Sequence, residues 1–393
     1  MRAKQIYTYC LFAVFFVCAM IHATQGAMLT GWIEHYRLEA AAQGAIGSVQ
    51  SAGMLVALLV LVWQAGKVAK NTIITFSFIA IVALLFVVSF MPPFWLLIVI
   101  YCFVGVFYGS ICSLLSSVIA DLHDGEDSSK YMSRLHGVYG AGGLVLPLFF
   151  RALLGGGMYW NIAFRVVASI LAAILVVFII LSNYSLKSLA PRRGSNKRIT
   201  SGDLKDFFTR GTNILLIMGV LLYGMHQSVI TTWSIRYVEV FLGNRALSSL
   251  TLSLYWAGVT VSRLLTHKVL PVLPIKIVFF GNFIAAVAIF TGVLSGSATA
   301  VAVLTFVMGL ANGTTMPALI SACCADNDCN TILPTNVMNF ALYTAFFLCP
   351  LVVGAIESYT SLSGGMLLSA FFAAISGLAI LTYWRKKKKA QGC

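Results

Sequence analysis

The residues best suited to chemistry lie within residues 132–151, MSRLHGVYGAGGLVLPLFFR. This stretch is mostly apolar, is about one membrane thickness long, and contains a histidine, four glycines and a proline. Five of its residues recur every three or four positions and would share one stripe of a helix: His136, Gly140, Gly143, Pro147 and Arg151. Glycine lets a second backbone approach, and an ionisable group is costly to bury in a membrane. The stripe therefore predicts a helix lining a transport pathway, with simple close packing as the alternative.

The amino-acid composition indicates the class of protein to which this helix belongs. Of the 393 residues, 60% are hydrophobic and 10% are charged, whereas a soluble chain carries about 25% charged residues. The sequence therefore indicates a multi-pass membrane protein and not a soluble enzyme. The net charge of +14 does not indicate a nucleic-acid partner, because most of the positive charge borders apolar segments. The sequence contains no phosphate-binding G-x-x-x-x-G-K-[ST] motif and no catalytic constellation.

Twelve apolar segments predict an all-α membrane fold of two six-helix bundles. The segments are 6–31, 42–63, 72–91, 94–120, 134–156, 160–182, 212–242, 246–270, 275–296, 298–322, 334–357 and 362–384. They divide the chain into an N-terminal bundle (1–182), a basic linker (183–211), a C-terminal bundle (212–384) and a basic tail (385–393). If the N-terminus is inside, 21 of the 26 Lys and Arg residues lie on the inner side. Both termini and the linker are therefore expected in the cytoplasm.

The two bundles repeat in sequence. His22 and His226 are 204 positions apart, and so are two pairs of glycines in GVFYG and GLANG, Gly105 with Gly309 and Gly109 with Gly313. At a spacing of 203, Pro147 matches Pro350 and His136 matches Asn339. Agreement of three helix pairs within one residue predicts an internal duplication.

Polar residues inside the predicted spans are the remaining candidates for solute binding or coupling. None of the twelve acidic residues falls near the middle of a span, so histidines are the candidate proton carriers. Tying helices together is the alternative role for each. In the seventh span, an aromatic ring beside amides and hydroxyls would suit a sugar-like solute. The candidates are His136, His22, His226, Gln25, Tyr108, Gln227, Trp233, Asn312 and Asn339.

Three spans resemble the fucose-permease-like branch of the major facilitator superfamily. LHGVYGAGGLVLP resembles N-x-x-H-x-x-x-G-x-G-x-x-x-P, and YGMHQSVITTWSIRY resembles G-x-E-x(5)-W-x(3)-Y with Gln227 at the usual glutamate. SLYWAGVTVSRLL is similar to slfWxGxxxGR, in which Arg263 matches. The resemblance implies alternating access to a solute site near the midplane. The sequence departs from this branch in two places: the loop WQAGKVAKN lacks the superfamily's aspartate, and the first and fourth spans lack carboxylates. The resemblance therefore does not imply the proton-coupled sugar mechanism of this branch.

Together these features predict a secondary transporter of a small polar solute, with a sugar favoured by the family resemblance and with a histidine-based proton link or another coupling ion. An efflux permease for amphipathic compounds and a solute receptor that does not transport remain alternatives. Gly140, Gly143, Pro147, Arg263 and Pro350 are expected to serve gating or structure. The protein is expected to be a monomer in the plasma membrane, without cofactor. A metal site is not expected, because Cys323, Cys324 and Cys329 lack the regular spacing and histidines of zinc sites.

Overall fold

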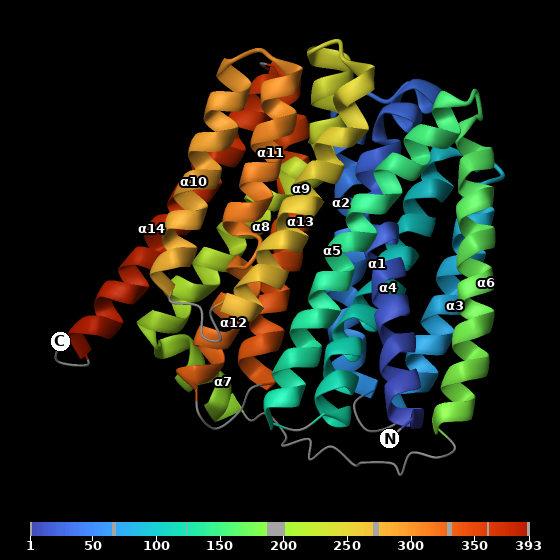
Figure 1. The fold of residues 1–393 in the computed structure, drawn as a ribbon. Coiled ribbons are helices and arrows are strands. Elements are labelled where there is room, and N and C mark those ends of the chain that lie inside the picture. Colours follow the sequence, from blue (N-terminus) through green and yellow to red (C-terminus); the bar gives the residue numbers. More distant parts are fainter. Residues whose placement is uncertain are drawn as a thin grey trace. The chain divides into compact units, whose positions relative to one another are not determined.

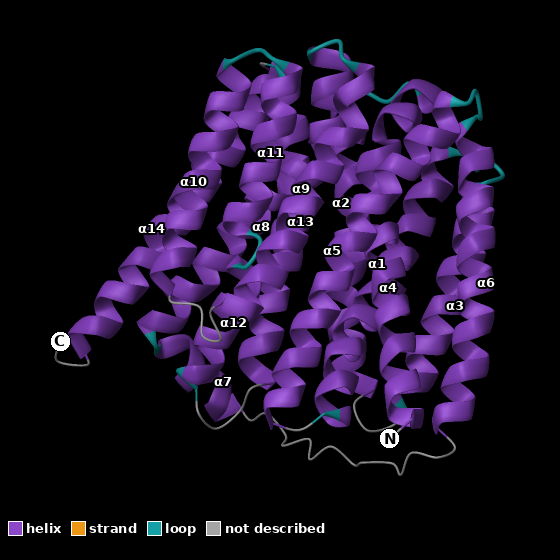
Figure 2. Cartoon of the chain, in the orientation of Figure 1, coloured by secondary structure: helices purple, strands orange, loops and turns teal. Residues whose placement is uncertain are grey.

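Helices make up nearly all of the protein. The computed structural model describes residues 2–64, 68–123, 125–186, 201–269, 275–327, 332–359 and 361–390, and every regular element in these ranges is a helix (Figure 2). Eleven helical segments in this part of the chain are long and apolar enough to cross a membrane. Helices suit the interior of a membrane because their backbone N–H and C=O groups form hydrogen bonds within the segment. The predicted all-α membrane fold is confirmed.

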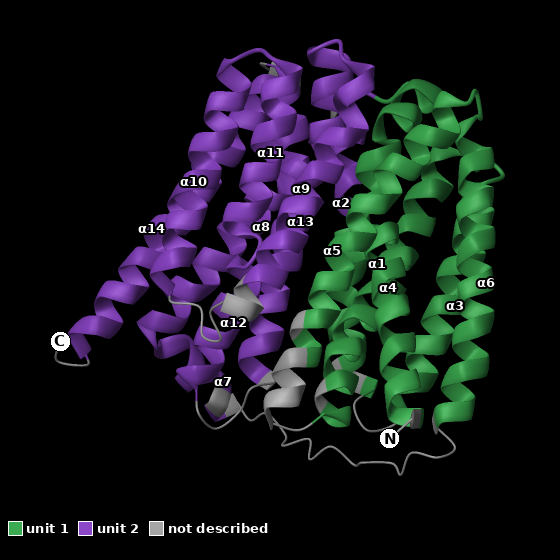
Figure 3. Cartoon of the chain, viewed as in Figure 1, with its two compact units in different colours: residues 1–38, 49–195 green, residues 39–48, 196–393 purple. Residues whose placement is uncertain are grey.

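The chain forms two compact units, distinguished by colour in Figure 3. The first unit comprises Met1–Leu38 and Val49–Ser195. In chain order (Figure 1) its helices are α1 (Arg2–Tyr36), α2 (Ala40–Gln64) from Val49 onward, α3 (Lys70–Val88), α4 (Phe94–Leu122), α5 (Gly125–Gly155) and α6 (Trp160–Leu186).

The second unit comprises Glu39–Ser48 and Asn196–Cys393, so it includes the first part of α2. Its other helices are α7 (Ser201–Thr209), α8 (Gly211–Arg236), the π-helix η1 (Tyr237–Phe241), α9 (Arg245–Val269), α10 (Ile275–Leu294), α11 (Ala298–Asn312), α12 (Thr315–Ala325), α13 (Ile332–Tyr359) and α14 (Leu362–Ala390).

Each of the twelve predicted spans coincides with helix, but two of them are not single helices. The seventh consists of α8 and η1, and the tenth consists of α11 and α12. The eighth, α9, is long enough to span but is more polar than the eleven others. The predicted linker 183–211 contains the end of α6 and the whole of α7, and residues 187–200 lie outside the described ranges. The predicted tail continues α14 as far as Ala390.

In the first unit, α2 and α4 cross at glycines without side chains between them. A Cβ on Gly53 would collide with the carbonyl of Cys102, and one on Gly105 would collide with the carbonyl of Gln50. A Cβ on Gly109 would lie 3.0 Å from Cα of Met54. These glycines allow the two backbones to touch, as small residues do between membrane helices.

The second unit repeats this crossing between α9 and α11. A Cβ on Gly258 would collide with the carbonyl of Phe306, and one on Gly309 would collide with the carbonyl of Tyr255. A Cβ on Gly313 would lie 2.8 Å from Cα of Val259. Every contact here matches one in the first unit at a spacing of 204 or 205 residues. The sequence repeat is therefore a repeat of helix packing.

The tenth span breaks at Gly313 and Thr314 because of a proline one turn later. Pro317 has no N–H to donate to the carbonyl of Gly313, four residues earlier, and its ring would clash with that carbonyl. The Gly313 carbonyl instead accepts a 2.9 Å hydrogen bond from Nε of Arg263 on α9. The corresponding position in α4 is Ser113, and α4 runs unbroken to Leu122. The break is thus a difference between the two repeats.

An ion pair joins the ends of α8 and α13. Arg236 Nη2 lies 3.3 Å from Glu357 Oε1, and the two side chains are only 15% and 17% exposed. Among the described residues, Arg236 Nε and Glu357 Oε2 have no hydrogen-bond partner, so each charge is incompletely compensated. The stability of this region is therefore expected to depend on both charged side chains.

A second polar network joins the ends of α12 and α14. Asp326 accepts hydrogen bonds from the Tyr383 hydroxyl at 2.8 Å and from Lys387 Nζ at 2.5 Å. On α12, Cys323 Sγ lies 4.0 Å from Asn213 Oδ1, and Cys324 Sγ lies 3.7 Å from Thr335 Oγ1. No group of three or more His, Cys, Asp or Glu side chains in the described ranges is arranged to hold a metal ion. Cys329 lies outside those ranges.

Candidate functional site

Three predicted site residues of the first unit meet around two aromatic rings. The rings of His22 on α1 and Tyr108 on α4 stack at 5.8 Å with 17° between their planes. The Tyr108 hydroxyl forms a 2.6 Å hydrogen bond with that of Tyr139 on α5. Phe15 contacts both Tyr139, at 4.8 Å, and His136, at 5.5 Å between ring centroids. We call these five residues the aromatic cluster.

Gln25 lies one turn beyond His22 on α1 and is 7% exposed. No acidic residue belongs to the aromatic cluster, in which imidazole rings and phenols supply the polar atoms. Such groups exchange hydrogen bonds with a neutral solute, and an imidazole can also carry a proton. The solute-binding or coupling roles of His136 and His22 stay predictions, and the cluster places both residues beside aromatic side chains.

Close backbone packing on α5 occurs outside the predicted glycine stripe. A Cβ on Gly142 would collide with the carbonyl of Phe16 on α1 and lie 3.0 Å from Cβ of Ala19. Gly142 points to a different side of α5 from His136, since a step of six residues leaves the two side chains about 240° apart around the helix. Gly140, Gly143 and Pro147 are buried. The contact with α1 thus uses Gly142 and leaves the stripe of His136 on another face.

Removing the hydroxyl of Tyr139 should weaken the first unit slightly. We expect Tyr139→Phe to lower its unfolding free energy by about 1 kcal/mol, because the mutation leaves the buried Tyr108 hydroxyl without its partner. Thermal unfolding of the purified protein measures this effect. Tyr131→Phe is the control, since Tyr131 stacks on His123 at 3.8 Å through its ring. Equal midpoints for the two variants would show that the Tyr108–Tyr139 bond adds nothing.

In the second unit, His226 is used to join helices. It is fully buried, and its Nδ1 lies 2.7 Å from Oγ of Ser369 and 3.2 Å from the carbonyl of Ser369 on α14. Trp233 is also fully buried, and Tyr237 begins the π-helix, where its ring stacks on Phe241 at 5.3 Å. The expected aromatic face of the seventh span therefore lies in packed protein. Gln227, the next residue after His226, is 6% exposed.

Asn312 ends α11 just before the break and is completely buried. Neither its Nδ2 nor its Oδ1 has a hydrogen-bond partner among the described residues. Arg263 was predicted to serve gating or structure, and it holds the neighbouring Gly313 carbonyl. Asn339 lies partly buried on α13. Pro350, further along α13, packs against α2: a Cβ on Gly44 would lie 2.8 Å from the Pro350 carbonyl.

Sequence reasoning missed several residues that shape these sites. Tyr139 and Phe15 complete the aromatic cluster, and the glycine at position 258 completes the second crossing. Tyr139 lies within residues 132–151, but spacing alone does not show which neighbour a phenol reaches. Pro317 was a readable signal for the break in the tenth span, because a proline inside a helix frees the carbonyl four residues earlier.

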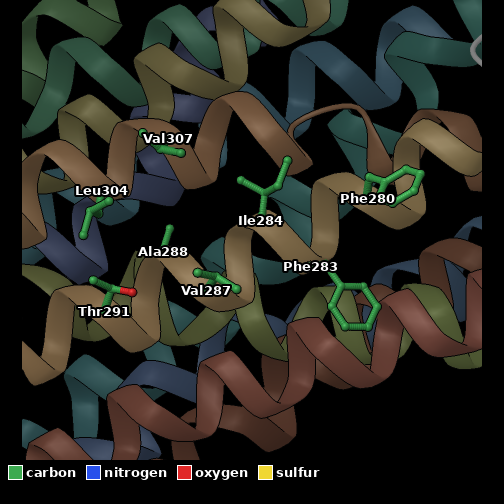
Figure 4. Close-up of a pocket in the computed structure, with 8 residues that line it drawn as sticks. All are labelled: Phe280, Phe283, Ile284, Val287, Ala288, Thr291, Leu304 and Val307. Atoms are coloured by element: carbon green, nitrogen blue, oxygen red, sulfur yellow. The ribbon is translucent and has the colours of Figure 1, made fainter.

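A groove in the second unit has the wrong chemistry for a polar solute. It has a volume of about 350 Å³ and lies between α10 and α11 (Figure 4). Phe280, Val287 and Leu304 are typical of its lining, and Thr291 is the one polar side chain among the eight that line it. Large apolar side chains on α10 are exposed around it, as expected of a helix that faces lipid.

Two repeated units of membrane-length helices, with polar residues buried inside them, are the layout of a multi-pass membrane transporter. The family model of the Major Facilitator Superfamily matches residues 11–326. The chain belongs to this superfamily. Among curated proteins, none matches the sequence.

Solved structures with the same fold are distant in sequence. A bacterial homologue of the human lysosomal transporter Spinster, in an inward-facing and unoccupied conformation, superposes with a TM-score of 0.78 at 13% identity, covering 98% of this chain and 97% of that one. The nucleoside transporter NupG superposes with a TM-score of 0.74 at 13% identity, covering 98% and 99%. At this identity the likeness shows the fold alone.

Proposed function

We propose that this protein is a secondary transporter of the plasma membrane that moves a small, uncharged polar solute by alternating access, with both termini in the cytoplasm. The observation that carries the proposal is the aromatic cluster, which gathers two histidines and two phenols inside membrane spans. Ionisable residues at such positions are costly and mark solute or proton pathways. A sugar or a nucleoside fits this chemistry: rings cover the apolar face of the solute while imidazole and phenol groups bond its hydroxyls.

We further propose that a proton is the coupling ion and that His136 carries it. Glu34, Glu39, Glu239 and Glu357 lie at or near the ends of membrane-length helices, and no acidic residue in the described ranges lies near the middle of one. A histidine is the remaining side chain that changes charge near neutral pH. His136 lies on α5 against Phe15, at the edge of the aromatic cluster.

The experiment is uptake by the full chain reconstituted into liposomes, with and without an inward proton gradient. We expect His136→Ala to lose gradient-driven accumulation, by about tenfold or more, and to retain exchange of solute at equal pH. His35→Ala is the control, because His35 is exposed and bonds Tyr159 at the end of α1. L-fucose and uridine are the labelled probes. Uptake that ignores the gradient, with His136→Ala fully active, would refute the proton link.

A further inference from the structure

The register of packing identifies the true counterpart of His22. In the first unit, a Cβ on Gly142 would lie 3.0 Å from Cβ of Ala19, and in the second, a Cβ on Gly224 would lie 2.8 Å from Cβ of Ala345. Gly142 and Ala345 are 203 residues apart, as Pro147 and Pro350 are. The same contact therefore pairs Ala19 with Gly224, 205 residues on.

At this spacing, His22 corresponds to Gln227 and not to His226. The side chains agree with this register. His22 faces Tyr108 on the fourth span, whereas His226 faces Ser369 on the twelfth, so the two histidines occupy different helix faces. One residue turns a helix by about 100°, which is enough to separate these faces.

The packing register also shows that Tyr108 corresponds to Asn312. The two residues are 204 positions apart, and each directly precedes a glycine of the repeated crossing, Gly109 or Gly313. Since His22 and Tyr108 are in contact in the first unit, their counterparts Gln227 and Asn312 are expected to face each other in the second. There, two carboxamides replace the imidazole and phenol rings.

The Asn312 carboxamide has hydrogen-bonding capacity that no described residue uses. Asn312 is 0% exposed, and both of its amide atoms lack a partner among the described residues. A buried, unsatisfied amide is destabilising and calls for an explanation, such as a ligand or an ordered water. Thr231 Oγ1 donates a 3.0 Å hydrogen bond to the backbone carbonyl of Gln227, so that bond does not involve the Gln227 side chain.

We propose that the Gln227 and Asn312 carboxamides form a subsite that binds a hydroxyl group of an uncharged solute. An amide offers a donor and an acceptor side by side, and a hydroxyl offers the same pair in return. A cation is disfavoured because Arg263 holds the adjacent Gly313 carbonyl at 2.9 Å. This subsite rests on the proposed transport function and names the class of solute: neutral and hydroxyl-bearing.

A second buried asparagine gives a matched control. Asn282 on α10 is also 0% exposed, but its Nδ2 donates to the Val278 carbonyl at 2.8 Å and to Thr315 Oγ1 at 3.0 Å. Replacing this amide by leucine breaks the bond to Thr315, which joins α10 to α12, and the bond to Val278 within α10. Replacing Asn312 by leucine breaks no side-chain hydrogen bond among the described residues and removes a buried polar group that has no partner there.

The experiment compares thermal unfolding of the full chain in lipid nanodiscs. We expect Asn312→Leu to keep its Tm or raise it by up to about 4 °C, and Asn282→Leu to lower its Tm. L-fucose or uridine should raise the Tm of the wild type, because a ligand of the folded state stabilises it. That rise should disappear in Asn312→Leu and in Gln227→Leu.

Three outcomes would overturn the subsite: a fall in Tm for Asn312→Leu as large as that for Asn282→Leu, a full solute response in Asn312→Leu, or a wild-type response confined to the charged probes fucose 1-phosphate and uridine monophosphate. Any of these can occur while vesicle uptake still demonstrates transport. Absence of uptake for every probe, with Asn312→Leu stabilised, would instead refute the transport function and support the assignment of Asn312 as a group kept for binding.

Discussion

Alanine in place of Gly258 is expected to prevent this protein from folding stably. The added methyl group would collide with the Phe306 carbonyl, lie 2.6 Å from the Leu310 nitrogen and lie 3.0 Å from the Gly309 carbonyl carbon. All three obstacles are backbone, so no side-chain rotation relieves the overlap, and α9 and α11 must separate. Overpacking of this kind costs about 3 kcal/mol or more when the backbone itself must move.

The first unit should respond in the same way at the equivalent position. Gly53→Ala would collide with the Cys102 carbonyl and approach the Val106 nitrogen to 2.8 Å. Folded yield by size-exclusion chromatography and the thermal midpoint measure both variants. Gly31→Ala is the matched control, because Gly31 lies within α1 and an added Cβ would have no neighbour within 4 Å. That variant should be as stable as the wild type or slightly more so. A monodisperse Gly258→Ala protein with an unchanged midpoint would contradict the crossing.

Glu357→Gln is expected to destabilise the second unit by about 2 kcal/mol. The mutation leaves the Arg236 guanidinium, whose side chain is 15% exposed, beside a neutral amide. Breaking a fully buried pair costs about 3–5 kcal/mol, and the partial exposure of this pair reduces the expected loss. Thermal unfolding in lipid nanodiscs gives the difference.

The double variant Arg236→Met with Glu357→Leu should recover most of that stability. Apolar residues of similar volume remove both charges together, and such replacements are often neutral. Arg245→Met is the surface control: Arg245 is 82% exposed and lies 3.3 Å from Glu239. Its loss should change stability by less than about 1 kcal/mol. A double variant weaker than Glu357→Gln alone would show that the pair stabilises through its own attraction and not by mutual neutralisation.

The membrane fold could be predicted because every span except the eighth, α9, carries a strong signal in its own composition. The repeat was also readable, since the glycines at positions 105 and 309 keep their spacing. Which of the many glycines carry the crossings was not readable, because Gly53 and Gly258 are recognisable only by the opposite backbone.

Helix faces were the least predictable feature of the site. Equal spacing in sequence paired His22 with His226, while the packing register pairs His22 with Gln227. A difference of one residue is invisible in a count of positions, yet it moves a side chain by about 100° around its helix. The break after Asn312 depends on Pro317 and on an arginine from another helix, and only the first of these is local in sequence.

The contact between Gly47 of α2 and Pro350 of α13 bears on how the chain is made. A Cβ on Gly47 would lie 2.9 Å from Cβ of Pro350, so the two helices fit closely within the second unit. Pro350 lies 303 residues after Gly47, and a ribosome adds about 5–20 residues per second, so the partner of this glycine surface is synthesised roughly 15–60 s later. Until α13 has been synthesised, the start of α2 lacks the helix against which it packs in the folded protein. A nascent chain that stops before α13 presents this unfilled surface to the factors that survey membrane-protein biogenesis.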